Sequence, residues 1–272
     1  MTIMQLIDTH SHLYAEEFDT DREEAIARAA DVGVNTLLLP AIDTQSHERM
    51  FSLALAHPTM CYPMMGLHPT SVNDNPRWRE ELAEVERYLS QPPQGIEFCA
   101  VGEIGLDYYW SEEYKAEQRE AFITQCRWAA ERDMPVAIHT RAAWDDMCKI
   151  LEQEGERARA MGYRLRGVLH AYSEDAATYH RLAKSGNWLF GIGGVVTYKK
   201  SIVAEAVREM ALEDIVLETD CPYLTPVPHR GGRNESSYVR HVCEKVAEIK
   251  GINPDEVARV TTGNAQRMFL SK

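Results

Sequence analysis

Eight short apolar segments alternate with eight longer amphipathic segments, and this alternation constrains the fold more than any other feature of the sequence. The short segments are rich in Val, Ile, Leu and aromatic residues and are bounded by polar or turn residues, which is typical of β-strands. They cover residues 6–12, 35–41, 60–67, 97–104, 135–140, 165–171, 188–194 and 215–220. The longer segments are predicted helices at residues 21–32, 46–56, 77–89, 113–132, 144–159, 175–185, 203–210 and 236–250. Strands that alternate with helices pair in parallel, because each crossover returns the chain to the same end of the sheet.

The fold predicted from this pattern is an α/β fold, a (β/α)8 TIM barrel formed by residues 1–272 as a single domain. No Pro/Gly/Ser-rich linker, low-complexity run or repeat interrupts the series. Asn253 followed by Pro254 opens a short additional helix, because proline suits the first helical position. An open doubly wound sheet is the alternative. The lack of a glycine-rich turn after Asp8 weighs against its dinucleotide-binding form.

Charge and composition exclude several classes of protein. The formal net charge is −13, which argues against broad wrapping of duplex nucleic acid but leaves room for a locally basic cleft. The six cysteines form no CxxC pair, so neither a zinc ribbon nor a disulfide framework is indicated. The sequence also lacks a basic, apolar leader and an apolar run of about 18 residues. We therefore expect a cytoplasmic protein that does not enter the membrane and needs no obligate protein partner.

Two histidines, His10 and His12, come at the end of the first predicted strand. Side chains alternate along a strand, so both imidazoles would face one side and could hold a metal ion. Taken alone, the pair could equally be a chance occurrence at a strand edge. A barrel places its chemistry where strands end, and further candidate ligands should fall there. They do, at His10, His12, His68, Glu103, His139, His170 and Asp220.

This set of side chains exceeds what one tetrahedral ion can use, so we expect two divalent metal ions. Glu103 is the natural bridge between a side formed by His10, His12 and Asp220 and a side formed by His139 and His170. The donor types leave the metal open among Zn, Mn, Mg, Co and Ni. Asp220 and Glu103 are the expected catalytic residues, with Asp220 also able to act as general base. Glu218 is expected to orient a ligand histidine.

Six longer sequence motifs contain or flank the candidate metal ligands. They stand at Asp8–His12, Gly66–Pro69, Gly102–Tyr108, Pro135–His139, Gly194–Tyr198 and Glu218–Pro226. The chain resembles, over nearly its whole length, the TatD family of metal-dependent deoxyribonucleases, a branch of the amidohydrolase-like barrels. Arg230–Glu235 is similar to the family's Arg-Gly-x-x-Asn loop, and Asn264 and Phe269 match its C-terminal pattern. The resemblance implies the same six ligands, namely His10, His12, Glu103, His139, His170 and Asp220.

The chain departs from the family pattern at two places. The family usually reads Cys-Phe-Ser-Gly after the sixth-strand histidine, whereas this chain has Ala171-Tyr172-Ser173-Glu174. Ser236 replaces a proline that is common after the Arg-Gly-x-x-Asn-Glu block. His170 is retained, so the departures concern the shape and charge of the substrate rim. A carboxylate at Glu174 would repel phosphate unless it points away from the cleft.

The residues expected to bind substrate surround the metal ligands. They are His68, Tyr198, Arg230 and Asn234, together with the aromatic run at residues 108–110. Arginine forks suit phosphate oxygens, and aromatic rings can stack on unpaired bases. A solvated surface loop and ordinary apolar packing are the plainer interpretations of the same residues.

The family resemblance implies a phosphodiesterase that acts on DNA through a metal-activated water, and we expect an exonuclease for single-stranded ends. The alternative enzyme is a dinuclear amidohydrolase for a small cyclic amide, a lactone or another phosphoester. The non-enzymatic alternative is a metal-stabilised scaffold.

Overall fold

Eight parallel strands form the centre of the molecule in the computed structural model, which describes residues 4–271. They group into two hydrogen-bonded ladders, ordered β1-β2-β3 and β4-β5-β6-β7-β8, and every pairing is parallel. The strands are β1 Leu6–Asp8, β2 Val34–Leu39, β3 Cys61–Pro63, β4 Val101–Asp107, β5 Val136–Arg141, β6 Arg166–Leu169, β7 Asn187–Ile192 and β8 Ile215–Leu217.

The two ladders meet at both of their edges. On one side, Cys99 N donates to Pro63 O at 3.0 Å, and Met65 pairs with Val101 in an isolated parallel bridge. On the other side, Thr9 N donates to Leu217 O at 3.0 Å. A second isolated bridge joins residues 11 and 221. These contacts connect β3 to β4 and β8 to β1, so the strands form the predicted (β/α)8 barrel.

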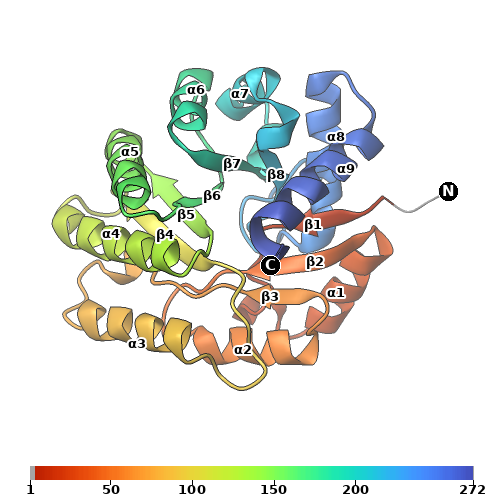
Figure 1. Cartoon of the computed structure of the whole chain (residues 1–272). Coiled ribbons are helices and arrows are strands. Elements are labelled where there is room, and N and C mark those ends of the chain that lie inside the picture. The colour runs from red at the N-terminus through yellow and green to blue at the C-terminus, as the bar shows by residue number, and fades with distance from the viewer. Residues whose placement is uncertain (1–3, 272) are drawn as a thin grey trace.

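The helices surround this barrel as an outer layer (Figure 1). They are α1 Arg22–Asp31, α2 His47–Ala56, α3 Trp78–Ser90, α4 Lys115–Glu131, α5 Trp144–Ala160, α6 Ala176–Ser185, α7 Ile202–Glu209, α8 Val239–Lys250 and α9 Pro254–Ala265. The predicted helices are confirmed, with boundaries that differ by three residues or fewer. The additional helix is also confirmed, and Asn253 caps it by accepting from Asp255 N at 2.9 Å.

The inside of the barrel is filled by a small apolar cluster. It takes one side chain from each strand or its immediate flank, namely Ile7, Leu38, Met64, Ala100, Ala137, Val168, Leu189 and Val216. Ala265, Met268 and Phe269 of the C-terminal segment join the same cluster. Figure 1 shows α9 ending near the middle of the ring of strands. The C-terminal segment therefore closes the end of the barrel opposite the strand carboxyl ends.

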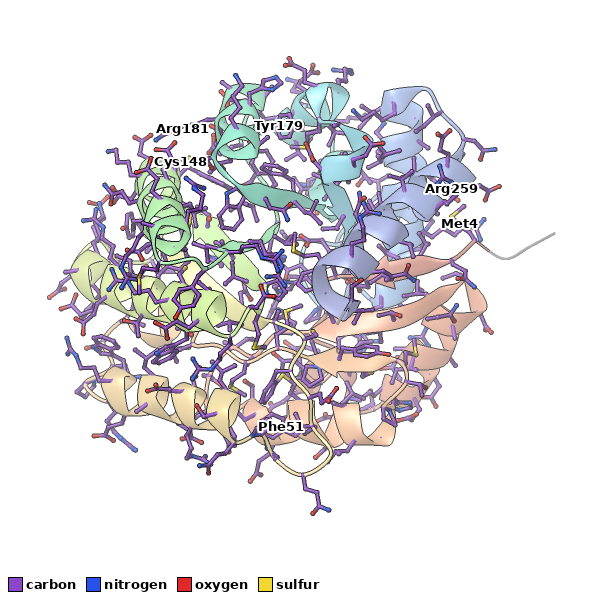
Figure 2. The ribbon with its side chains drawn as sticks, in the orientation of Figure 1. Met4, Phe51, Cys148, Tyr179, Arg181 and Arg259 are labelled. Carbon is purple, nitrogen blue, oxygen red and sulfur yellow. The ribbon has the colours of Figure 1, made fainter. Side chains whose placement is uncertain are left out.

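A larger core lies between the strands and the outer helices. Figure 2 shows Phe51 on α2, Cys148 on α5 and Tyr179 on α6 as parts of this outer layer. The ring of Tyr179 packs against Phe190 of β7 at a centroid distance of 4.9 Å. Burying a large apolar side chain stabilises a fold by about 1.5–3 kcal/mol. This layer holds the helices, and the loops that enter them, against the strands.

The predictions for the first, third, fourth and eighth strands are wrong in extent. The third and eighth strands end at Pro63 and Leu217, before their predicted ends at residues 67 and 220. Regular β1 ends at Asp8, because the following segment changes partners: Ser11 N donates to Leu38 O of β2, whereas Thr9 N donates toward β8. β4 continues three residues beyond the predicted end at residue 104, to Asp107. Gly105 lies so close to β5 that an added Cβ would stand 1.9 Å from His139 O. Only glycine fits at this position inside the strand.

No helix within residues 4–271 is long and apolar enough to cross a membrane.

Candidate metal centre

Seven predicted side chains meet at the mouth formed by the carboxyl ends of the strands. His10 and His12 follow β1, His68 follows β3, Glu103 lies in β4, His139 lies in β5, His170 follows β6 and Asp220 follows β8. They are far apart in sequence, and the parallel barrel brings them to one rim because every strand ends there. Most are buried, although Asp220 and His139 retain some exposure.

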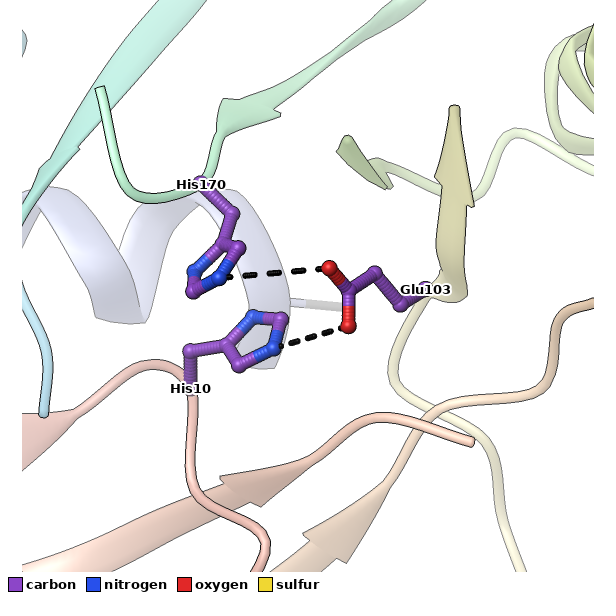
Figure 3. Close-up of side chains that lie close together, drawn as sticks. All are labelled: His10, Glu103 and His170. Carbon is purple, nitrogen blue, oxygen red and sulfur yellow. Dashed lines mark hydrogen bonds and ion pairs between the residues drawn. The ribbon is translucent and has the colours of Figure 1, made fainter. Parts of the chain in front are cut away.

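Glu103 occupies the centre of this cluster. Its Oε2 atom lies 3.1 Å from His10 Nε2, and its Oε1 atom lies 3.1 Å from His139 Nδ1. His170 Nε2 is 3.9 Å from Oε1, and Figure 3 shows this imidazole and that of His10 directed at the same carboxylate. The two oxygens of Glu103 thus face different histidines, which is the arrangement that a bridging carboxylate needs.

Asp220 completes the side of the cluster that β1 supplies. Its Oδ1 atom lies 3.5 Å from His12 Nε2, 3.6 Å from His170 Nε2 and 3.9 Å from His10 Nε2. The backbone of Asp220 is left-handed, with a φ of 59°. Such a conformation is uncommon outside glycine and recurs where a side chain must be aimed at a site.

A tyrosine that sequence reasoning missed sets the orientation of His12. Tyr14 Oη donates to Pro40 O at 2.6 Å, which uses its only proton. The 2.8 Å contact between Tyr14 Oη and His12 Nδ1 must then be donated by the imidazole. A proton on Nδ1 leaves Nε2 of His12 with a free lone pair, facing Asp220. This is the tautomer that a metal ligand requires.

Two further carboxylates hold the histidines of the other strands. Glu218 Oε1 lies 3.0 Å from His170 Nδ1, the position expected for an orienting group. Asp107 Oδ2 lies 2.9 Å from His139 Nε2, so His139 stands between Asp107 and Glu103. Sequence reasoning missed Asp107, because β4 was predicted to end before it. Asp107 comes four residues after Glu103, and this even spacing places both side chains on the same face of a strand. That spacing was the available signal.

Burial and charge oppose one another across the cluster. Burial lowers the pKa of His10 and of His68. For His170, burial also favours the neutral ring, but Glu218 and Asp220 outweigh it and raise the pKa to about 10. Burial would raise the pKa of Glu103, yet His10 and His68 hold it well below its usual range. The Glu103 carboxylate is therefore kept ionised by the imidazoles that hydrogen-bond to it and surround it.

The residues present fit a divalent metal. Three sets of side chains place one ligand atom each within 4.8 Å of one another: His10 with Glu103 and His170, His10 with His12 and Asp220, and His68 with Glu103 and His139. The rings of His10 and His170 stack with centroids 3.3 Å apart, and the buried His10 Nδ1 has no hydrogen-bond partner within residues 4–271. Imidazole and carboxylate donors of this kind suit Zn and other first-row metals. His68, expected at the substrate, lies 3.5 Å from Glu103 Oε1 and belongs to the third set.

A buried polar network behind the cluster ties β1 to β8. Asp8 accepts from Thr219 N at 2.9 Å and from Thr219 Oγ1 at 2.6 Å, and burial raises its pKa to about 7. Ser11 Oγ lies 3.0 Å from Ser236 Oγ and 3.2 Å from Cys221 Sγ. Ser236, which stands where the family commonly has proline, is thus part of the support for the segment that carries His10 and His12.

Asn234 does not fit the expectation that it binds substrate. Its side chain is fully buried, and Nδ2 donates to Thr219 O at 2.8 Å and to Tyr223 O at 2.6 Å. Asn234 therefore holds the segment around Asp220 in place, away from any substrate. Arg233, the residue before it, pairs with Asp21 of the loop before α1 at 2.7 Å.

A cavity of about 650 Å³ opens above the metal ligands, a size within the usual range for ligand sites of about 300–1,000 Å³. Tyr198 and Arg230 do not line it; the Arg230 guanidinium lies over the Tyr198 ring, 4.3 Å from its centroid. Trp110 from the loop after β4 and Arg141 at the end of β5 do line it. Among the described residues, the cationic wall of the cavity thus comes from β5 and not from the loops after β7 and β8.

The departure at residues 171–174 has a definite place in the cavity wall. Ala171, with a φ of 44°, donates its N–H to Glu218 Oε1 at 2.6 Å, and Tyr172 is buried. Both residues and Ser173 line the cavity. Glu174 is not among the lining residues, and the pKa of its carboxyl is raised by partial burial and by Asp175. Because Glu174 does not line the cavity, its carboxylate does not add to the negative charge of the cavity wall.

The barrel and its rim of histidines and carboxylates are those of a metal-dependent hydrolase. The family model described as "TatD related DNase" matches residues 7–270, and the chain belongs to this family. The metal-dependent hydrolase YabD of Bacillus subtilis is 37% identical over 269 residues, which cover 97% of this chain and 98% of that protein.

Two other similarities extend this result. A protein of Danio rerio named "Putative deoxyribonuclease tatdn3" is 32% identical over 97% of this chain and 96% of its own length. The crystal structure of YJJV, a TatD homologue from Escherichia coli, superposes with a TM-score of 0.88 at 26% identity and covers all of both chains. The fold and the class of enzyme predicted from the sequence are therefore confirmed.

Proposed function

We propose that this metal-dependent hydrolase is a phosphodiesterase that removes nucleotides from single-stranded ends of DNA. The observation that carries the proposal is the position of Glu103, whose two carboxylate oxygens each lie 3.1 Å from a different histidine. That arrangement suits two ions that share one carboxylate, and paired ions are a common means of displacing an oxygen from phosphorus. The name of the zebrafish relative supports DNA as the substrate.

The geometry suggests which side chains would hold each ion. One set comprises His10, His12 and Asp220, and the other comprises His68 and His139, while Glu103 faces both. His170, expected beside His139, instead lies beside His10 and 3.6 Å from Asp220 Oδ1. Bound divalent ions supply Lewis acidity and lower the pKa of a water molecule, so that a nucleophile exists near neutral pH.

The chain's own groups manage the proton and the orientation of the ligands. Burial would raise the pKa of Asp220, but His170 and His12 lower it, so that its carboxylate is ionised and its Oδ1 atom is the candidate general base. Glu218 and Asp107 fix the rings of His170 and His139 through contacts of 3.0 and 2.9 Å. Removal of such supporting partners typically costs 10–100-fold in metal affinity or activity.

The charge of the cavity favours an anionic substrate only when metal is bound. Its wall includes the carboxylates of Glu103, Asp107, Glu218 and Asp220, and among the described lining residues Arg141 alone is an arginine or lysine. A phosphodiester would be repelled by this wall unless cations neutralise it. Activity should therefore depend strictly on divalent metal.

The alternative substrate is a small cyclic amide, a lactone or another phosphoester. The depth of the ligand cluster favours it, because Glu103 is 3% exposed and His170 is 3% exposed, and a small molecule reaches such a site readily. A strand end also reaches it, whereas intact duplex does not. Measured turnover of DNA strands and of small esters and amides distinguishes the two substrates.

The test is incubation of metal-loaded protein with end-labelled single-stranded DNA in Mg, Mn, Zn and Co. We expect stepwise release of mononucleotides, slower attack on blunt duplex, and no activity in EDTA. A matched set of lactones and cyclic amides serves as the comparison. Turnover of those compounds without release of nucleotides in any metal would overturn the proposal in favour of the alternative.

A further inference from the structure

Two exposed aromatic side chains, Tyr109 and Trp110, lie beside the metal cavity. Trp110 is 67% exposed and Tyr109 is 58% exposed, and their rings meet edge to face with centroids 5.0 Å apart. Large aromatic side chains are costly to leave in water unless a partner covers them. Trp110 lines the same cavity as Glu103 and His139. The pair is therefore adjacent to the reaction site.

A guanidinium joins the two rings into one surface. The Arg141 Cζ atom lies 3.7 Å from the Tyr109 ring centroid and 5.4 Å from that of Trp110. Arg141 also lines the cavity. Among the described residues, its guanidinium has no carboxylate within 4.0 Å, so its charge is available to a ligand. The surface formed by Tyr109, Trp110 and Arg141 offers π-faces and a phosphate-binding fork together.

The backbone holds this surface in a defined place. Arg141 is paired in register with Asp107 across β4 and β5, and Tyr108 N donates to Arg141 O at 3.0 Å. Asp107 Oδ1 accepts from Tyr109 N at 3.0 Å. The loop carrying the rings is thus tied to the strand that positions Glu103. A surface held in advance binds with a smaller entropic loss.

Tyr108 differs from its two neighbours and serves as the anchor of the loop. It is 7% exposed, its hydroxyl donates to Asp146 Oδ2 at 3.1 Å, and Arg119 Nε donates to the same hydroxyl at 3.0 Å. The expectation that all three aromatic residues are available to bases is therefore wrong for Tyr108. The anchored residue directs the following two side chains outward.

We propose that Tyr109, Trp110 and Arg141 form a stacking platform for the unpaired base next to the phosphodiester under attack. This inference rests on the proposed function and identifies the feature that would make the enzyme prefer a strand end to a small diester. The base stacks on the indole, and the guanidinium contacts a neighbouring phosphate. A base paired within duplex does not offer its face to the indole, so the platform selects single strands.

The experiment compares binding of strands with and without bases. Fluorescence anisotropy measures the affinity of metal-loaded protein for a short labelled oligothymidylate with phosphorothioate linkages, and for a matched strand with abasic terminal nucleotides. Trp110→Ala is expected to weaken binding of the intact strand by about tenfold, within the range known for stacking of one base, and to weaken the abasic strand much less. Tyr163→Ala, which removes an exposed aromatic side chain far from the cavity, is the control.

The role of Arg141 is tested by the salt dependence of binding and by comparing two substitutions that differ in charge. Arg141→Gln should reduce the slope of log affinity against log salt by about 0.7, the value for one contact to a single strand. Arg141→Lys should keep the slope, because it keeps the charge, while losing affinity through the poorer stacking of an ammonium.

Turnover separates the failure of the platform from the failure of the proposed function. For Trp110→Ala, the ratio of kcat/KM for the oligonucleotide to kcat/KM for bis(4-nitrophenyl) phosphate should fall about tenfold. Equal losses on intact and abasic strands, or no loss, would overturn the platform even if the wild type releases nucleotides. A wild-type protein that hydrolyses small esters but neither binds nor degrades any strand would overturn the proposed function and the platform with it.

Discussion

The two ends of this barrel are built from opposite kinds of side chain. At the carboxyl ends of the strands, buried histidines and carboxylates surround Glu103 at distances of 3.1 to 3.9 Å. At the other end, Met268 and Phe269 of the C-terminal segment close an apolar cluster to which all eight strands contribute. Buried charge is costly and persists only where it is paired, whereas apolar burial is favourable without direction. The comparison suggests that chemistry depends on one end and stability on the other.

The largest effect is expected from a substitution at the carboxyl ends of the strands, where the metal ligands lie. Asp220→Asn removes the charge that lies within 4 Å of three histidine Nε2 atoms. Turnover of the substrate should fall by about a thousandfold, equivalent to roughly 4 kcal/mol of transition-state stabilisation. Thermal unfolding monitored by circular dichroism should show that the fold is retained. Unchanged turnover would favour the metal-stabilised scaffold over the enzyme.

The second prediction tests the apolar end. Phe269 is 7% exposed, and Phe269→Ala should lower the free energy of unfolding by about 3 kcal/mol, the low end for such a change because a chain terminus can partly collapse into the space. Activity per folded molecule, measured well below the melting temperature, should be retained. Leu55→Ala, at a half-exposed position on α2, is the control and should change stability by less than about 0.5 kcal/mol. A Phe269→Ala protein that is stable but inactive would contradict the division of roles.

The third prediction concerns the support of a single ligand. Glu218 lies 3.0 Å from His170 Nδ1, and Glu218→Gln keeps the size of the side chain while removing its charge. Metal affinity measured by calorimetry should fall by about 10–100-fold. An effect on stability with metal affinity unchanged would show that Glu218 belongs to the packing of the barrel and not to its metal centre.

The smallest expected effect lies at the edge of the mouth and depends on pH. Hydrogen bonds from Arg233 lower the pKa of Asp21 to about 2, below an unfolded value of about 3.9. The pair therefore contributes its full stability above about pH 4 and loses it as the pH falls toward 2. Because the pair is partly exposed, Asp21→Asn should cost no more than about 1 kcal/mol near pH 7. Denaturant titrations of both proteins across this range should converge at the acid end; a constant difference would contradict the assignment.

The sequence predicted the barrel and the ring of ligands because both follow from periodic patterns. Strand ends converge in a barrel whatever the details of its loops, so His139 and His170 could be placed beside Glu103 although they come from different strands. Local geometry was not predictable in the same way. Asp107 was missed because the fourth strand was predicted to end at residue 104, whereas in the structure β4 continues to Asp107. The close approach of β5 requires the glycine at position 105 inside that strand.

The sequence also could not predict which side chains on the rim are paired with one another, for a different reason. Arginines near the mouth look alike in sequence, yet Arg233 is paired with Asp21 at 2.7 Å, whereas Arg141 has no carboxylate partner within 4.0 Å among the described residues. Asn234 matched a motif, but its buried hydrogen bonds to Thr219 O and Tyr223 O serve the backbone. Which cation or amide is available to a ligand depends on contacts between segments distant in sequence.

The account depends most on Glu103 lying between two cations, and anomalous scattering tests this directly. Crystals of the wild-type protein grown or soaked with Mn²⁺ should show two anomalous peaks flanking the Glu103 carboxylate, one on the side of His12 and Asp220 and one on the side of His139. Glu103→Gln crystals treated in the same way should lose at least one peak. Anomalous density confined to another part of the molecule, with none near Glu103, would contradict the central claim.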